Sequence, residues 1–593
     1  MSRNARVRAV VGALAVLAAA SVAAQVREFI PVTDATLRNP SPNDWLMFSR
    51  TYDAQRFSPL DQINRGNVRQ LGLAWSRGLA DGTTETIPTV YDGVMYLTVP
   101  GSHVQALDAT TGDVLWEYRR EYENDRVGPG GRSKTLSMFE DLVYFTAPDA
   151  TIVALDARTG EVRWETRADA RGHTAGSIVV EGSVISGGTC TGGLRENCYI
   201  SAHDARTGAL VWKFYTAQAP DEPPGFDTWG GAPVETRRAS TWGVPGSYDP
   251  DTGLIYWGVA NPTPNTRADR HGGVPNAIGF TSPADLFSNS TVALDPATGR
   301  LAWYYQHLPG DDWDEDINQE RIILRTALNP DPAVVRWINP DVPRGDVRDV
   351  VVNIGEGGGL WVLDKHDGRF LWATPFPFDV DNFILQDIDV RSGTAHINEA
   401  LLVDEPGERH VVCFFNTRSY WPSAYNPEKN ALYVPYIDNC LDMTSAAPAI
   451  GDRPATRERR VGTPRPGSTP EGMNGLARID MATGRMTHWP QGPVPTTGAV
   501  LATAGDLIFW GDINRRFKAL DADTGELLWQ SILGGPISVS TITYGVDGRQ
   551  YVAVMTGDNL AQPGLIAGTM GPMPVDINPG SGNNAVYVFA LPR

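Results

Sequence analysis

The sequence is short of cysteine, of long apolar runs and of helical patterning. Only 4 of its 593 residues are Cys, and none lies in a Cys-x-x-Cys-His motif, which excludes a covalently attached c-type haem. Apart from the N-terminal segment, no stretch reaches the roughly 20 apolar residues that a membrane helix needs. Helical periodicity of useful length is almost absent, so the pattern excludes the helical fold classes.

Basic charge is also scarce. Lys and Arg total 50 against 69 Asp and Glu, which gives a formal net charge of −19 at pH 7. Because nucleic acid binding requires Lys and Arg concentrated on one face, this balance argues against a nucleic acid partner. Charged residues make up 20 % and hydrophobic residues 41 % of the chain, with 61 Gly and 44 Pro. This composition is typical of a globular, turn-rich protein with a large core.

The N-terminus has the features of a secretory signal. Arg3, Arg6 and Arg8 precede an apolar run over residues 9–20, and small residues follow up to Ala24. A membrane helix is the alternative, but the run is shorter than a bilayer span, and no Cys follows the cleavage site to carry a lipid. We therefore expect a signal peptide over residues 1–24 that is cleaved near Ala24, and a periplasmic protein without a membrane anchor.

The even number of cysteines in an exported chain predicts two disulfides. Proximity in the sequence pairs Cys190 with Cys198 and Cys413 with Cys440. A reactive thiol is the alternative interpretation of these residues.

A turn motif recurs seven times along the chain. Each copy follows a β-patterned run and places Gly four positions after an Asp, and Trp four or five positions after the Gly. In a hairpin the Asp caps the turn, the Gly takes a positive φ, and the next strand carries the Trp to a fixed place. The copies are Asp108–Gly112–Trp116, Asp156–Gly160–Trp164, Asp204–Gly208–Trp212, Asp295–Gly299–Trp303, Asp364–Gly368–Trp372, Asp480–Gly484–Trp489 and Asp521–Gly525–Trp529.

A Trp at one fixed place in every unit requires a neighbouring unit to bury it. Units of this kind stack radially, and radial four-stranded units form a propeller. Trp75 supplies an eighth such Trp without the preceding turn. The sequence therefore predicts one all-β domain over residues 25–593, an eight-bladed β-propeller closed by pairing of strand 585–589 with the N-terminal segment. The longer intervals between repeats predict loops on one face that carry the site.

Segments outside the turns resemble the quinoprotein alcohol dehydrogenases, a family that carries pyrroloquinoline quinone (PQQ) on an eight-bladed propeller. The resemblance extends over essentially the whole mature chain and includes segments within residues 44–68 and residues 502–507. It implies a PQQ- and metal-dependent enzyme that oxidises an alcohol to the carbonyl by hydride transfer to the quinone. It also implies an external electron acceptor, a soluble c-type cytochrome.

The acidic segment 310–316 is similar to the family segment that holds the catalytic Asp. Oxidation of an alcohol in this way needs a base for the hydroxyl proton and a Lewis acid at the quinone oxygen, and clustered carboxylates with a bound cation supply both. The resemblance places the base at Asp314. Asp316 reaches the same cation if the segment is extended, because positions i and i+2 then point the same way. A solvated acidic loop is the alternative interpretation.

Two further metal ligands come from the resemblance. The segment 257–262 is similar to the one that supplies an Asn carbonyl ligand, here Asn261, although a plain turn residue before Pro is the alternative. The carboxylate ligand of the third blade has no ungapped match: the alignment falls on Gly192, and only a shift reaches Glu196. Oxygen ligands suit a hard cation, with Ca²⁺ expected first and a lanthanide ion as the alternative.

The cofactor-binding residues also follow from the resemblance. Trp242, in the segment 239–243, is similar to the family Trp on which the planar cofactor stacks, and a core Trp is the alternative. A flat tricyclic acid also needs cations and polar partners, which the resemblance assigns to Arg132, Thr174 and Glu85.

The chain departs from the family pattern at two more places. No two cysteines are adjacent, so the disulfide that covers the other cofactor face in many members is missing, and residues 126–131 stand there instead. Gly357 occupies the position where members usually have Lys or Arg near the quinone oxygens. The Gly-rich stretches and the missing Cys pair suggest room for a bulky or secondary alcohol.

Two other classes of function are alternatives to this one. A cofactor-free propeller that serves as a scaffold for protein assembly is the main alternative, but such a protein is expected to be shorter, lipid-anchored and without the acidic segment. A sugar-binding or sugar-cleaving propeller would need paired carboxylates from facing loops together with stacking aromatics. No feature of the sequence singles out that third class.

Overall fold

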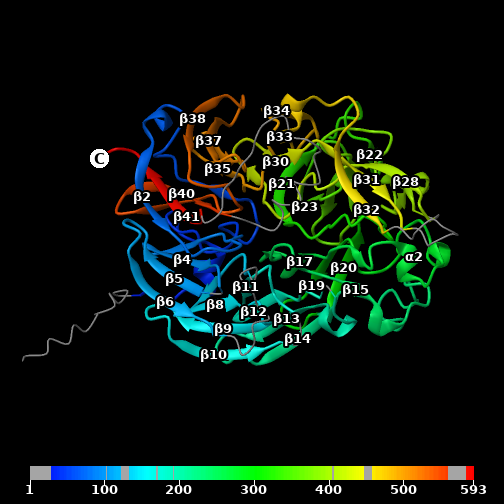
Figure 1. The fold of residues 1–593 in the computed structure, drawn as a ribbon, viewed down its shortest axis with the longest axis horizontal. Helices are drawn as coiled ribbons and strands as arrows, with labels where there is room; N and C mark the ends of the chain where they lie inside the picture. Colours follow the sequence, from blue (N-terminus) through cyan, green and yellow to red (C-terminus); the bar gives the residue numbers. More distant parts are fainter. Residues whose placement is uncertain are drawn as a thin grey trace, which may run out of the picture.

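The computed structural model describes residues 29–101, 103–121, 132–168, 171–190, 192–403, 406–446, 457–557 and 583–593. This part of the chain is built mainly of strands and has two short α-helices, α1 (Asp34–Arg38) and α2 (Arg267–Arg270). The main sheets follow one another around a ring in chain order (Figure 1). No helix in the described ranges is long and apolar enough to cross a membrane.

Eight sheets within the described residues have four or five strands. In the first three sheets the first strand is buried and the last is partly or largely exposed, so the first strands face the centre of the ring. The first four sheets are β3 (Thr89–Tyr91), β4 (Val94–Val99), β5 (His103–Asp108), β6 (Val114–Arg119); β7 (Ser137–Phe139), β8 (Leu142–Thr146), β9 (Thr151–Asp156), β10 (Val162–Arg167); β11 (Ser177–Val180), β12 (Ser183–Gly187), β13 (Tyr199–Asp204), β14 (Leu210–Tyr215); and β16 (Ser247–Asp249), β17 (Leu254–Gly258), β19 (Ser290–Leu294), β20 (Leu301–Gln306).

The other four sheets follow the same plan, with one added strand in two of them. They are β21 (Ile322–Leu328), β23 (Asp346–Gly355), β24 (Gly358–Asp364), β25 (Phe370–Thr374), β22 (Trp337–Ile338); β29 (Ala424–Asn426), β30 (Ala431–Ile437), β33 (Asn474–Asp480), β34 (Met486–Gly492); β1 (Phe57–Ser58), β35 (Leu501–Thr503), β36 (Leu507–Gly511), β37 (Arg516–Asp521), β38 (Leu527–Ile532); and β39 (Ile542–Val546), β40 (Arg549–Thr556), β41 (Ala585–Ala590), β2 (Gly72–Gly78).

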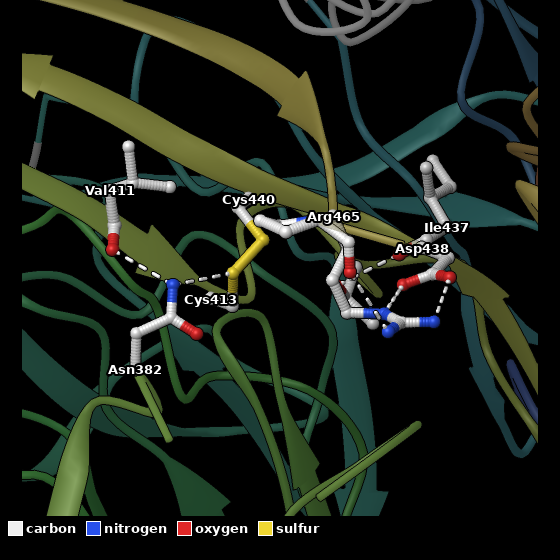
Figure 2. Close-up of a disulfide and its surroundings, with 9 residues drawn as sticks. Asn382, Val411, Cys413, Ile437, Asp438, Cys440 and Arg465 are labelled. Atoms are coloured by element: carbon white, nitrogen blue, oxygen red, sulfur yellow. Dashed lines mark hydrogen bonds and ion pairs between the residues drawn. A yellow bond between two sulfur atoms is a disulfide. The ribbon is translucent and has the colours of Figure 1, made fainter. Parts of the chain in front are cut away.

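Three smaller sheets lie in the long insertions. They are β15 (Arg238–Ala239) with β18 (Pro262–Thr263), β26 (Leu385–Ile388) with β27 (Ala395–Ile397), and β28 (Arg409–Cys413) with β31 (Asn439–Thr444) and β32 (Arg459–Pro464). Both predicted disulfides are confirmed, Cys190–Cys198 and Cys413–Cys440. The second joins directly paired residues of β28 and β31 (Figure 2).

The turn glycines hold neighbouring sheets together. Gly160 has φ +73°, and a Cβ built there would lie 2.5 Å from the ring of Trp116 in the preceding sheet. The same indole donates from Nε1 to the carbonyl of Ala157 at 2.9 Å. Equivalent bonds from the repeat Trp to the next turn are Trp75 to Ala109, Trp164 to Ala205 and Trp212 to Pro296. Each of these Trp residues is therefore covered by its neighbour, as the repeat predicts: Trp75, Trp116 and Trp212 are buried, and Trp164 is partly buried.

The ring is closed by strands from the two ends of the chain. β2 pairs with β41 in antiparallel register, with Leu73 opposite Phe589, and the two strands lie side by side in Figure 1. On the other side, Trp529 of the preceding sheet donates to the carbonyl of Leu71 at 3.1 Å. The predicted all-β propeller and its closing strand are thus confirmed, and Trp75 acts as a repeat Trp.

The segment over residues 44–58 connects the first strands of several sheets across the ring. Its backbone carbonyls accept from the amides of three first strands: Tyr52 from Tyr248, Asp53 from Ile323, and Gln55 from Tyr425. These bonds measure 3.1, 2.9 and 2.8 Å. One N-terminal segment therefore ties together sheets that are far apart in the sequence.

Arg56 is a fully buried charged side chain of this segment. Its guanidinium donates to the carbonyls of Phe48 and Val500, at 2.6 and 2.9 Å, and to that of Thr541. Removing the guanidinium would leave these acceptors buried without their donor, which costs about 1–3 kcal/mol for each group.

We expect Arg56→Met to lower the free energy of unfolding by about 3 kcal/mol or more, because three buried carbonyls lose their partner together. The midpoint of urea unfolding checks this. Arg65→Met is the control, since Arg65 forms ion pairs with surface Asp residues while its side chain stays 43 % exposed, and exposed pairs contribute about 0–1 kcal/mol. An Arg56 variant as stable as the control would contradict the role of the segment.

Candidate active site

The loop that follows β20 meets three other segments. Asp316 in this loop accepts hydrogen bonds from the indole of Trp242 and from the backbone of Asn261, and its carbonyl accepts from the amide of Glu356 at 3.0 Å. Trp242 follows β15, Asn261 follows β17, and Glu356 lies between β23 and β24. The fold thus brings together Trp242, Asn261, Asp314 and Asp316, which the sequence singled out.

The first residues of the acidic loop are structural anchors. Asp311 accepts from the backbone amides of Trp313 and Glu315 at 2.7 and 2.8 Å. Asp312 accepts from the amides of Arg267 and Val403 at 2.6 and 2.9 Å, which ties the loop to α2 and to a distant insertion. All four Asp and Glu residues of the loop other than Asp314 are buried, so the loop is not the solvated acidic turn considered as the alternative.

Asp314 is the exception in burial and in backbone geometry. Its side chain is 43 % exposed, and its φ is +67°, in the left-handed region that costs a non-glycine residue energy. One carboxylate oxygen accepts from Nδ2 of Asn261 at 2.7 Å, and the other lies 3.7 Å from Nη2 of Arg460. An accessible carboxylate held in a strained turn is a suitable position for a base.

Asp316, unlike Asp314, is buried. It accepts from Trp242 Nε1 at 2.9 Å and from the amide of Asn261 at 3.0 Å. Burial, followed by the charge of Asp314, raises the pKa of Asp316 to about 8. A cation placed among these carboxylates would favour the ionised form and reverse that shift.

Two further carboxylates face the same cluster and were missed by the sequence analysis. Glu315 and Glu356 are buried, and burial raises the pKa of each well above its usual range; the charge of Glu356 adds to the shift of Glu315, and the charge of Asp316 adds to that of Glu356. Both oxygens of Glu315 lack a hydrogen-bond partner among the described residues. Glu315 stands in the acidic motif, which was a usable signal, whereas nothing local marks Glu356.

Trp242 is partly exposed, although Thr241 and Gly243 beside it are buried. Its carbonyl accepts from Lys134 Nζ at 3.0 Å and from the Thr174 hydroxyl at 3.1 Å. Trp242 therefore offers a partly accessible aromatic side chain in a fixed orientation, and Thr174 lies against its backbone.

The predicted Glu85 and Arg132 join the same site through Lys134. Glu85 is fully buried and accepts from Arg132 Nε at 2.6 Å and from the Tyr420 hydroxyl at 2.7 Å, with Lys134 Nζ 3.5 Å away. Lys134 lies over the rings of Trp242 and Tyr420, at 5.1 and 4.7 Å. Burial lowers the pKa of Lys134 to about 8. Lys134 and Tyr420 are additions to the site that no sequence motif marked.

Glu196 is the one predicted site residue that the fold does not bring to the cluster. It is exposed on a 3₁₀ turn, Arg195–Asn197, between the two disulfide-bonded cysteines. Within the described ranges, no hydrogen bond or ion pair links it to Asn261, Asp314 or Asp316, and no group of three or more His, Cys, Asp or Glu is arranged to hold a metal. The segment 126–131, expected over the cofactor, lies outside the described residues.

The residues of this cluster fit the metal ion and the PQQ that the resemblance implies. Asp314, Asp316 and the amide oxygen of Asn261 are hard donors suited to Ca²⁺ or a lanthanide ion. The buried carboxylate of Glu315, which accepts no hydrogen bond from the described residues, adds negative charge that a cation would offset. The amide of Asn261 now directs its nitrogen to Asp314, so it would turn to present its oxygen. The exposed indole surface of Trp242, with cationic side chains beside it, suits a flat acid.

Known proteins match this arrangement over most of the chain. The family model for the glucose/ethanol/alcohol dehydrogenase β-propeller domain, designated PQQ, matches residues 45–140, 167–376 and 472–552. Quinohemoprotein alcohol dehydrogenase ADH-IIG of Pseudomonas putida is 31 % identical over 552 residues, which cover 87 % of this chain and 72 % of that protein. Quinoprotein alcohol dehydrogenase PedH of Pseudomonas putida is 27 % identical, over 91 % of this chain and 89 % of that one.

Solved structures agree. A europium-containing methanol dehydrogenase superposes with a TM-score of 0.78 at 27 % identity and covers 94 % of this chain and 99 % of its own. The fold and the site together define a quinoprotein propeller. The chain belongs to the PQQ-dependent alcohol dehydrogenase family.

The charge on Lys134 should make PQQ binding depend on pH. Below about pH 8 the side chain is protonated and attracts the carboxylates of the cofactor; above that value it becomes neutral, so affinity should fall by up to about tenfold per pH unit. Titration of PQQ into the apoprotein between pH 7 and 9.5 measures this, and Lys134→Met should abolish the dependence.

Lys518→Met is the matched control for Lys134→Met, because Lys518 is also buried over a Trp ring, that of Trp510 at 5.1 Å, in another sheet. The control should keep the pH dependence of the parent. A parent protein whose PQQ affinity is constant from pH 7 to 9.5 would show that Lys134 does not act on the cofactor.

Proposed function

We propose that this chain is a PQQ- and metal-dependent dehydrogenase that oxidises an alcohol to its carbonyl compound. The observation that carries the proposal is the joint placement of Asp314, Asp316 and Asn261 against the indole of Trp242. When bound, PQQ supplies the acceptor for the hydride. Family membership of the whole propeller supports the assignment.

In the proposed reaction, Asp314 accepts the hydroxyl proton of the alcohol. Its exposed carboxylate can reach a substrate, whereas the buried Asp316, Glu315 and Glu356 cannot. A candidate base must stand within hydrogen-bond reach of the proton that it takes. Asp316 and Asn261 are proposed to hold the metal with Asp314, and Trp242, Arg132, Thr174, Glu85 and Lys134 to hold the cofactor.

Ca²⁺ is the proposed metal, and a lanthanide ion is the alternative, since one similar structure is a europium-containing enzyme. We further propose that residues 1–24 are removed on export to the periplasm, which mass spectrometry of the mature N-terminus tests, and that electrons pass to a soluble c-type cytochrome. The two disulfides are consistent with an oxidising compartment. The absence of adjacent cysteines supports a bulky or secondary alcohol as the substrate.

The function is tested by reconstituting the purified protein with PQQ and with Ca²⁺ or La³⁺, then assaying primary, secondary and polycyclic alcohols with a dye acceptor. The expected result is metal-dependent oxidation of at least one class. A holoprotein that shows bound quinone by absorbance and oxidises none of these alcohols would overturn the proposal. A cytochrome c in place of the dye tests the acceptor separately.

Asp314→Asn should reduce turnover by about 10²–10⁴-fold, because the amide keeps the shape of the side chain and an oxygen ligand but cannot take the proton. PQQ absorbance of the variant should stay near that of the parent, which separates the loss of the base from the loss of the cofactor. Oxidation at the parent rate would show that another group is the base.

Asp316→Ala should weaken metal binding, and more for La³⁺ than for Ca²⁺, because the carboxylate balances more charge on a trivalent ion. Isothermal titration of both ions into the apoprotein measures the difference. Glu196→Ala is the control: its carboxylate is exposed on the 3₁₀ turn, so both affinities should remain those of the parent. If Glu196→Ala weakens metal binding instead, the proposed ligand set is wrong.

A further inference from the structure

The site contains several acidic side chains close together, and it has Gly357 where members of the family usually have Lys or Arg. Asp314, Glu315, Asp316 and Glu356 lie in one cluster. A Cβ at Gly357 would already lie 3.0 Å from Glu315 Cγ and 3.0 Å from Ile384 Cδ1, so a side chain at this position would have to displace both neighbours, and the glycine itself carries no charge. A positive group that serves Asp314 must therefore come from another part of the chain.

Arg460 of β32 is such a group. Its Nη2 lies 3.7 Å from Asp314 Oδ2 and donates to the carbonyl of Trp313, the residue before Asp314. The guanidinium also lies 5.7 Å from the ring centre of Phe415. The side chain is only 16 % exposed, so its charge is poorly screened by water and acts on its neighbours at short range.

The direction of Arg460 is set by strand alternation. In β32 the pairs opposite β31 run Arg459 with Thr444 and Arg460 with Met443. Successive side chains of a strand point to opposite faces: Arg459 is 56 % exposed and lies 3.5 Å from Asp442, whereas Arg460 points inward to Asp314. Arg459 is therefore exposed to solvent, whereas its neighbour Arg460 is largely buried beside Asp314.

The sheet that carries Arg460 is cross-linked internally and bonded to the segments beside it. The Cys413–Cys440 disulfide joins β28 to β31, and Asn382 donates to the carbonyl of Val411 at 3.0 Å beside it (Figure 2). At the far end of β32, Arg465 binds both carboxylate oxygens of Asp438 at 2.7 and 2.9 Å, also drawn in Figure 2.

The inner face of this sheet packs into the hydrophobic cluster that contains Trp313. Val412, Leu441 and Met443 are fully buried in it. Trp313 is fully buried as well, and its Nε1 donates to the carbonyl of Leu401 at 2.9 Å. The sheet and the loop that holds Asp314 are therefore parts of one packed unit, and Arg460 spans the contact between them.

We propose that Arg460 is a positioning residue for Asp314, delivered by the inserted β28–β31–β32 sheet. This inference rests on the proposed function, in which Asp314 is the base. Asn261 donates to one carboxylate oxygen of Asp314 at 2.7 Å, and Arg460 lies 3.7 Å from the other. If Asn261 turns its amide oxygen to a metal, its hydrogen bond to Asp314 is lost, and Arg460 is the side chain that still orients the carboxylate.

The test compares Arg460→Met, Arg460→Lys and the matched control Arg459→Met in the PQQ- and metal-loaded protein. Arg460→Met should lower kcat by about 10–100-fold with little change in KM, because a misplaced reacting group costs rate on that scale. Arg460→Lys, which keeps the charge, should recover part of the loss. Arg459→Met should have the kcat of the parent.

Metal titration of the apoprotein gives a second readout that does not depend on turnover. Because Arg460 repels a cation at the carboxylates, Arg460→Met should bind La³⁺ several-fold more tightly than the parent and Arg459→Met should not. Weaker La³⁺ binding together with a lower unfolding midpoint would show a structural role instead and overturn the proposal. Parent kcat in Arg460→Met would also overturn it.

The two hypotheses fail in different ways. If the loaded parent protein oxidises no alcohol, the proposed function fails, and the titration still shows whether Arg460 acts on the carboxylate cluster. If the parent is active and Arg460→Met matches it in kcat and in La³⁺ affinity, only the role of Arg460 fails.

Discussion

The structure depends on the contact between each repeat Trp and the turn of the following unit. A Gly at positive φ leaves space for the indole, as Gly160 does for Trp116. The indole N–H groups of Trp75, Trp116, Trp164 and Trp212 also donate to a carbonyl of the next turn. No unit can bury its own Trp, so the series of sheets is stable only when it closes on itself. Closure requires strands from opposite ends of the chain, β2 and β41, to share one sheet.

Because the ring is closed, long insertions from different sheets come into contact with one another. The acidic loop after β20 meets segments that follow β15 and β17, and each meeting is made by a specific bond to Asp316 or Asp312. The carboxylates of Asp311 and Asp312 accept hydrogen bonds from backbone amides and anchor the loop. The side chain of Asp314 is instead partly exposed. The same motif therefore divides into residues that build the loop and one residue, Asp314, whose carboxylate stays accessible.

The buried carboxylates of this site need positive charge nearby to offset their repulsion. Buried carboxylates repel one another, and in the described part of the chain their compensation comes from separate directions: Lys134 and Arg132 stand beside Glu85 and Trp242, and Arg460 stands beside Asp314. A hard cation among Asp314, Asp316 and Asn261 would supply the remaining balance. The arrangement suits a cofactor site that is assembled around its ions rather than a passive scaffold.

The sequence by itself determined the ring and the closing strand through the regular spacing of its repeat, and both disulfides through the proximity of the cysteines. The grouping of Trp242, Asn261, Asp314 and Asp316 followed from the resemblance to the quinoprotein family and not from spacing. Only the tertiary structure revealed Lys134, Tyr420, Glu356 and Arg460. These residues reach the site across sheets from positions distant in the sequence, and their direction depends on strand register and on where the insertions pack. Glu196 shows the converse, since a motif position inside a short disulfide loop can turn outward to solvent.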